Sequence, residues 1–280
     1  MNYRCLFCFI RAFENILENA KTQEAQKEKI TLEFLKYMSE LKTDTAIPEY
    51  AKNIHAKIKE LIQDNDPYLE AKKQSNRIVK NLYPELKQKV KNSKNPFETA
   101  LRLSIAGNII DYGASAKFDI LKTIEHVLKA DFRINDSELL RKKIEQADSI
   151  LYLGDNAGEI VLDKLFLETI DHPNVHFAVR GMPILNDITM SDADEFDLHA
   201  VAKVISNGYD APSTLIEKSS DEFRKIYRSA DLIISKGQGN FEGLMHETDE
   251  RIFFLFMVKC FVIANHIGVK PGDFVVLHNK

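Results

Sequence analysis

The sequence has few cysteines, no long apolar run and no excess of positive charge. Only three of its 280 residues are cysteine, an odd number that argues against a framework of structural disulfides. No run approaches the roughly 18 apolar residues that a membrane-spanning helix needs, and the amino terminus lacks the long apolar core and cleavage site of a secretory signal. We therefore expect a cytoplasmic protein with no membrane partner.

The formal net charge of -4 argues against a general nucleic-acid binder. Lysines are concentrated in the amino-terminal half, where solvated helix faces explain them, whereas the carboxyl-terminal half is acidic. Loops that collect carboxylates for a cation would produce such an acidic half. The length suffices for one large domain or two ordinary ones, with ample material for a core.

The hydrophobic pattern divides the chain in two. In the first part apolar residues recur at helical spacing, and we expect no strand before residue 149. Afterwards short apolar runs alternate with helical segments, with strands expected at 150–153, 175–179, 201–205, 232–235, 253–257 and 274–277. The pattern predicts an α+α/β chain: an all-helical domain over residues 1–147, then a three-layer α/β/α Rossmann-like domain with a mostly parallel sheet over residues 148–280.

The sequence G-D-N-A-G-E at residues 154–159 directly follows the first expected strand. In open α/β sheets ligands bind beyond the carboxyl ends of the strands, which is where Asp155 and Asn156 would lie. Their oxygen atoms suit magnesium or manganese better than zinc. The alternative is that both residues only cap a helix and form a turn, and this stretch alone does not decide between the two.

A second polar cluster, R-G-M-P-I-L-N-D-I-T at residues 180–189, follows the strand at 175–179. If the two strands are neighbours, Asp155 and Asp187 face one crevice. Two carboxylates that converge without a local counter-charge need a cation, so a metal ion is the economical explanation.

The third cluster, K-G-Q-G-N-F-E at residues 236–242, suits an anionic ligand. Lys236 supplies positive charge, and Gly237 and Gly239 allow backbone N–H groups to approach phosphate oxygens. Arg180, at the end of its strand, is a further candidate for binding phosphate. Lys259 follows the strand at 253–257 and is expected to point into the same crevice.

Two further motifs admit both structural and functional interpretations. The segment A-G-N-I-I-D-Y-G at residues 106–113 places Asn108 and Asp111 in an apolar stretch, where a buried amide and a capping carboxylate explain them without a ligand. Cys5 and Cys8 have the C-x-x-C spacing of half a zinc site or of a redox pair. No second such pair completes a zinc site, so we favour a structural role on a helix.

These clusters, in this order, resemble the metal-dependent damage-control phosphatases, formerly the domain-of-unknown-function 89 family. The C-x-x-C and A-G-N-I-I-D sequences resemble its prokaryotic branch, and the resemblance covers almost the whole chain. It implies divalent metal ligands at Asp155, Asn156 and Asp187, with magnesium, manganese, cobalt or nickel as candidate metals. It further implies substrate binding by Lys236, Gly237, Gln238, Gly239, Asn240 and Lys259, although V-K-C-F stands here where other branches carry R-T-x-K.

The resemblance implies hydrolysis of phosphate esters of small metabolites, especially damaged or surplus sugar phosphates. Arg180, Asn108 and Asp111 are further candidates for substrate binding, and Asp155 or Asp111 is a candidate to activate water. The D-x-D signature of aspartyl-phosphate enzymes is absent from residues 155–157, which favours water as the nucleophile. Two other functions stay open: an S-adenosylmethionine-dependent carboxyl methyltransferase and a non-catalytic sensor of a phosphorylated metabolite. The oligomeric state is also open.

Overall fold

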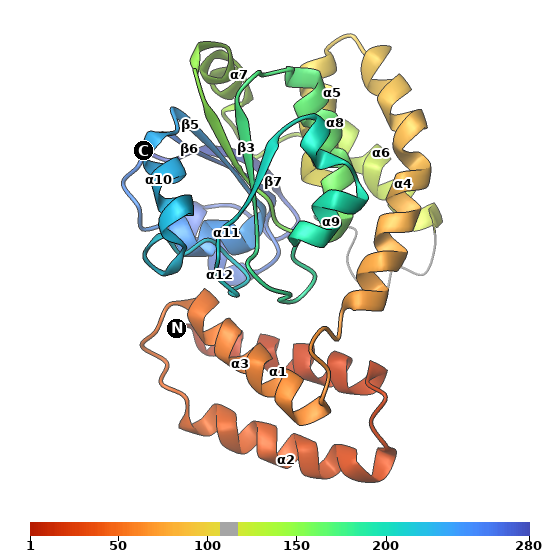
Figure 1. Cartoon of the computed structure of the whole chain (residues 1–280), viewed down its shortest axis with the longest axis vertical. Coiled ribbons are helices and arrows are strands. Elements are labelled where there is room, and N and C mark those ends of the chain that lie inside the picture. The colour runs from red at the N-terminus through yellow and green to blue at the C-terminus, as the bar shows by residue number, and fades with distance from the viewer. Residues whose placement is uncertain (107–116) are drawn as a thin grey trace.

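A computed structural model of the chain describes residues 1–106 and 117–280, so Asn108 and Asp111 lie outside the described residues (Figure 1). The chain begins with helices: α1 (Tyr3–Asn19), α2 (Glu24–Glu40), α3 (Ile47–Ile62), α4 (Leu69–Lys91), α5 (Pro96–Ala106) and α6 (Lys117–Lys129). Asparagines cap two of these helices: Asn2 accepts from Arg4 N, and Asn95 accepts from Glu98 N ahead of Pro96. No helix in the described ranges is long and apolar enough to cross a membrane.

Seven strands form one sheet in the order β1-β7-β6-β5-β2-β3-β4. They are β1 (Ile134–Asn135), β2 (Ile150–Leu153), β3 (Val175–Val179), β4 (Lys203–Ser206), β5 (Leu232–Lys236), β6 (Ile252–Met257) and β7 (Phe274–His278). Every neighbouring pair is parallel except β6 and β7, which are antiparallel. The expected mostly parallel sheet after a helical amino-terminal region is therefore confirmed.

One strand was not expected. β1 precedes residue 149 and pairs in parallel with the last strand, β7, so the expectation of no earlier strand is wrong. A strand of two residues is too short to show any hydrophobic alternation. Its existence depends on hydrogen bonds to a segment about 140 residues later in the chain, as when Arg133 N donates to Phe274 O.

Helices cover both faces of the sheet (Figure 1). The helices α4, α5, α6, α7 (Ser137–Gln146), α8 (Ile160–Ile170) and α9 (Met190–Glu195) contribute to the hydrophobic core on one face. The helices α10 (Asp221–Ser229), α11 (Gly237–Leu244) and α12 (Phe261–Ile267) cover the other. Short 3-10 helices complete the connections: η2 (Ala157–Glu159), η3 (Leu198–Ala200) and η4 (Ile216–Lys218). Because β2 lies between the two cores, all four of its residues are buried.

The helices α1, α2 and α3 have a hydrophobic core of their own, in which Phe13 stacks on Phe34 with ring centroids 3.9 Å apart. They lie together at one end of the molecule (Figure 1). From α3, Lys59 Nζ donates to Pro183 O and Lys52 pairs with Asp210 at 2.7 Å, so α3 meets the loops at the carboxyl ends of β3 and β4. The division into domains at residue 147 stays a prediction, since shared packing does not test independent folding.

We predict that Phe177→Ala destabilises the protein by about 3–5 kcal/mol, the usual cost of emptying the space of a buried phenylalanine. Phe177 is fully buried and stacks on Tyr152 with centroids 5.0 Å apart. Denaturant unfolding followed by circular dichroism measures the change. The control Phe261→Ala removes a ring that is 60% exposed and should cost less than about 0.5 kcal/mol. Equal losses in the two variants would contradict this account of the core.

Candidate active site

The loops after β2 and β3 are joined by backbone hydrogen bonds. Asn156 and Asp187 form an antiparallel bridge, Ile188 N donates to Asp155 O at 2.8 Å, and Ala157 N donates to Asn186 O at 2.8 Å. All three expected metal ligands, Asp155, Asn156 and Asp187, therefore come from two directly paired loops at the carboxyl edge of the sheet. Each of these side chains is at least nine-tenths buried.

Arg180, the residue after β3, lies between the two aspartates. Its Nε donates to Asp187 Oδ2 at 2.5 Å, and its Nη2 lies 3.6 Å from Asp155 Oδ1 without an acceptor at hydrogen-bond distance in the described part of the chain. The expectation that the aspartates converge without a local counter-charge is therefore wrong. An arginine at a strand end reaches back across its own loop, which linear spacing does not reveal.

Lys236 is not exposed at the edge of the sheet, as a phosphate clamp would be. It is fully buried, and its Nζ donates to Ser104 O at 2.8 Å, to Glu159 Oε2 at 3.0 Å and to Asp163 Oδ1 at 2.7 Å. An ammonium group has three N–H donors, so these acceptors use all of them. The expected role in substrate binding has no support in this geometry, and Lys236 instead holds two carboxylates beneath the site.

The end of β5 and the first turn of α11, residues 236–240, pack against Asp155. Gly237 has φ +78°, and a Cβ built on it would lie 1.8 Å from Asp155 Oδ2, so the close approach requires glycine. Gln238 donates to Glu242 Oε1 at 2.8 Å and accepts from Lys259 N at 2.8 Å. Residues 236–240 therefore hold the backbone just before α12 and also pack around Asp155.

Asn240 is fully buried and serves the fold in this structure. Its amide donates to Gly154 O at 3.0 Å and to Lys236 O at 2.8 Å, and its carbonyl accepts from Thr214 Oγ1 at 2.9 Å. A Cβ on Gly239 would lie 2.5 Å from Pro212 O. Asn240 and Gly239 therefore both contribute to the packing of α11 against neighbouring segments of the chain. Substrate contact by either residue stays a prediction.

Lys259 is exposed, yet its positive charge favours the ionised forms of Asp155, Asp187 and Glu242. It therefore lies within electrostatic range of the crevice, as expected from its position after β6. The role of Lys259 in binding substrate is untested and remains a prediction.

Negative charge exceeds positive charge in the buried network. Burial, followed by the charges of Glu159 and Asp187, raises the pKa of Asp155 well above its usual value. Burial also raises the pKa of Asp187, and it raises the pKa of Asp163 to about 6. The network consists of four carboxylates and two cations, namely Asp155, Glu159, Asp163, Asp187, Arg180 and Lys236. With every carboxylate ionised, the excess is two negative charges.

This charge excess and the donor chemistry fit a divalent cation. Asp155 and Asp187 supply carboxylate oxygens and Asn156 supplies an amide oxygen, the ligand types that hard cations prefer. The described ranges hold no group of three His, Cys, Asp or Glu side chains that could bind a metal. Among the described residues, Asn156 is the expected ligand that would join Asp155 and Asp187 around a cation.

Sequence analysis missed the residues beneath the site. Glu159 and Asp163 are four residues apart and both fully or almost fully buried, and Tyr152 OH donates to Asp163 Oδ1 at 2.7 Å. The sequence contains one indication of this buried carboxylate. Asp163 lies inside the apolar run I-V-L-D-K-L-F, where a carboxylate exposed to solvent is not expected.

The three cysteine thiols are free: Cys5 and Cys260 are partly buried and Cys8 is exposed. Gln238 Nε2 lies 3.6 Å from Cys260 Sγ. The structural role expected for Cys5 and Cys8 is untested and remains a prediction.

Comparison with known proteins agrees with this geometry. Residues 1–275 match the family described as damage-control phosphatase ARMT1-like domain. The chain belongs to this family.

Relatives from archaea cover nearly the whole chain. A damage-control phosphatase of Pyrococcus horikoshii is 32% identical over 285 residues, which cover 100% of this chain and 98% of that protein. A damage-control phosphatase of Archaeoglobus fulgidus is 34% identical over 232 residues, covering 80% of each chain. The crystal structure of a DUF89 family protein from Pyrococcus horikoshii superimposes with a TM-score of 0.92 at 30% identity, covering 100% of this chain and 99% of that one.

We predict that Gly237→Ala destabilises the protein by about 1–3 kcal/mol more than Gly268→Ala, because only the former drives a methyl group into a neighbouring side chain. Gly268 has φ +77°, close to the +78° of Gly237, but nothing lies within 4 Å of its built Cβ. The control therefore measures the backbone cost alone, about 1 kcal/mol. Unfolding free energies of both variants test the prediction, and equal values would show that Asp155 is not held against Gly237.

Proposed function

We propose that this protein is a metal-dependent phosphatase that hydrolyses phosphate monoesters of small metabolites. The observation that carries the proposal is the buried network at the carboxyl ends of β2 and β3, in which four carboxylates face two cations and would leave two negative charges in excess when all are ionised. A divalent cation would balance this charge, and oxygen ligands at such an edge suit phosphate chemistry. The names of the relatives support the same reaction class.

In this proposal Asp155, Asn156 and Asp187 would hold magnesium, manganese, cobalt or nickel. A bound divalent cation supplies Lewis-acid polarisation of a phosphoryl oxygen and offsets charge on the leaving oxygen. Arg180 would orient Asp187 and offer its Nη2 to a phosphate oxygen, while Lys259 attracts the anionic substrate. Asp155 is the candidate among the described residues to accept a proton from the attacking water.

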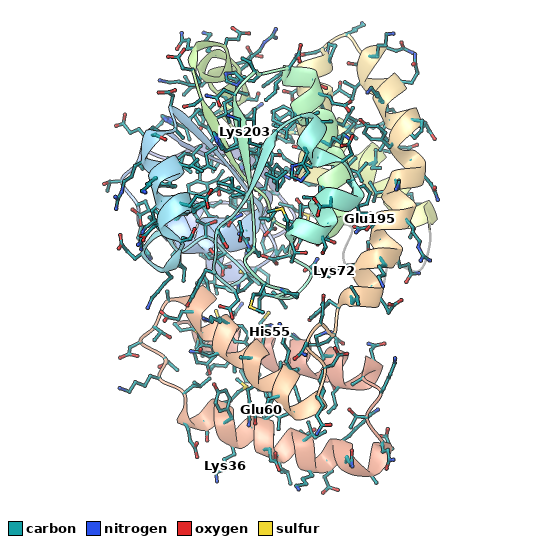
Figure 2. All side chains as sticks on the ribbon, in the orientation of Figure 1. Lys36, His55, Glu60, Lys72, Glu195 and Lys203 are labelled. Atoms are coloured by element: carbon teal, nitrogen blue, oxygen red, sulfur yellow. The ribbon has the colours of Figure 1, made fainter. Side chains whose placement is uncertain are left out.

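The substrates we propose are damaged or surplus sugar phosphates and related small phosphorylated metabolites. Roles for Asn108 and Asp111 in binding them stay predictions, because these residues lie outside the described ranges. Helix α3 meets the loops at this edge of the sheet. His55, labelled in Figure 2 on α3, is buried, and burial lowers its pKa to about 4, so it is neutral at pH 7 and adds no charge for the substrate.

We predict that the metal-loaded protein releases phosphate from sugar phosphates or p-nitrophenyl phosphate, and that Asp155→Asn lowers kcat/KM at least about 100-fold by removing one ligand charge. Phosphate release is measured with magnesium, manganese, cobalt and nickel in turn. The matched control is Glu195→Gln, which neutralises an exposed carboxylate on α9 (Figure 2) and should leave the rate within about twofold.

Two outcomes would contradict this function. Methyl transfer from S-adenosylmethionine without a metal requirement would favour the carboxyl methyltransferase. Tight binding of a phosphorylated metabolite without turnover, in folded and metal-loaded protein, would favour a sensor.

We also predict that Asp155→Asn raises the melting temperature of the metal-free protein while abolishing its stabilisation by manganese. The surroundings of Asp155 disfavour a negative charge, so a neutral side chain of the same shape relieves that cost, at about 2–4 °C per kcal/mol. Thermal unfolding with a chelator and with excess manganese measures both effects. An unchanged or lower melting temperature of the variant in the presence of chelator would show that the negative charge of Asp155 does not destabilise the metal-free protein.

A further inference from the structure

The side chain of Asn156 has only one favourable orientation in its surroundings. Its Nδ2 donates to Asp155 Oδ2 at 3.2 Å and to Glu159 Oε1 at 2.6 Å. Both amide hydrogens therefore point at carboxylates. A carboxamide rotated by 180° would place its own oxygen against those two carboxylate oxygens, which is repulsive. The shorter contact is the one to Glu159.

Glu159 is itself held from the other side. Its Oε2 accepts from Lys236 Nζ at 3.0 Å, so each carboxylate oxygen of Glu159 accepts from a different donor. Glu159 and Lys236 are both fully buried. Burial alone would lower the pKa of Lys236, but the charges of Asp163 and Glu159 outweigh burial and raise it, so the lysine stays charged.

We propose that Glu159 is a positioning residue, which fixes the Asn156 carboxamide with its oxygen turned away from both neighbouring carboxylates and available to a cation. The proposal rests on the metal-binding function proposed above, and it gives the buried Lys236 a role: the lysine occupies Oε2, so that only Oε1 remains for Asn156.

The hydrogen-bond pattern makes Glu159→Gln a specific test. A glutamine has one oxygen and one NH2 group, so it cannot accept from both Lys236 and Asn156. The charged lysine takes the oxygen, and the glutamine NH2 then faces Asn156 Nδ2. Asn156 relieves this clash by rotating, which turns its NH2 group to the position where its oxygen would bind a cation.

Asp163→Asn is a control of matched charge. Asp163 accepts from Tyr152 OH and from Lys236 Nζ with the same oxygen, Oδ1, so an asparagine keeps both hydrogen bonds. This variant also removes one negative charge next to Lys236. In the described structure Asp163 makes no hydrogen bond to Asn156. The Asp163→Asn variant therefore tests the loss of charge without rotation of the Asn156 carboxamide.

The experiment is Mn²⁺ binding to chelator-treated, folded protein by titration calorimetry, which does not depend on turnover. We expect Glu159→Gln to raise the Kd about 10–100-fold, the usual effect of losing a group that orients a metal ligand, and Asp163→Asn to raise it less than about threefold. The double variant Glu159→Gln with Lys236→Met should recover most of the affinity, because the glutamine oxygen is released to accept from Asn156. The double variant also has the same net charge as the wild type, because it loses one negative and one positive charge.

Three results would overturn the inference: Glu159→Gln binding as tightly as wild type, Asp163→Asn weakening binding as much as Glu159→Gln, or no recovery in the double variant. Circular dichroism and thermal unfolding establish that each protein is folded. A wild-type protein that binds no Mn²⁺ would instead contradict the proposed function, so the two failures are distinguishable.

Discussion

The ammonium group of Lys236 is the interaction on which the architecture of the site depends. It is fully buried at the end of β5 and donates to Ser104 in α5, to Glu159 in η2 and to Asp163 in α8. An unpaired buried ammonium costs several kcal/mol, so the buried end of β5 depends on the acceptors that these three elements supply. The helical layer over this face of the sheet therefore helps to define the floor of the crevice.

The same network explains how the loops after β2 and β3 converge. Their backbones pair through Asn156 and Asp187, while Arg180 Nε holds the Asp187 side chain. These contacts bring like charges together against their repulsion, and Arg180 compensates only part of it. Sites that bind cations commonly keep such an uncompensated charge, at a cost in stability that packing elsewhere offsets. The fully buried strands β2 and β5 provide that packing.

Much of this fold could be predicted from the sequence, because β2 and β3 are short apolar runs with polar residues at each end. β1 could not, since two residues carry no periodicity and their partner is at the other end of the chain. Among the site residues, Asp155, Asn156 and Asp187 come together as expected from strand adjacency. The direction of Lys236 was not predictable, because whether the last residue of a strand points outward or under its neighbours depends on the acceptors that the fold places there.

The positions of the three cations limit the ways in which an anion can bind. All three N–H groups of Lys236 donate to acceptors inside the protein. Arg180 is buried and donates to Asp187. Lys259 is exposed, on a loop whose backbone is held by Gln238. In the proposed function, Lys259 would attract a phosphorylated molecule from a distance, and Arg180, whose Nη2 has no hydrogen-bond acceptor in the described structure, would orient it at close range. The proposed binding would thus be divided between a surface charge that attracts the anion and a buried charge that orients it.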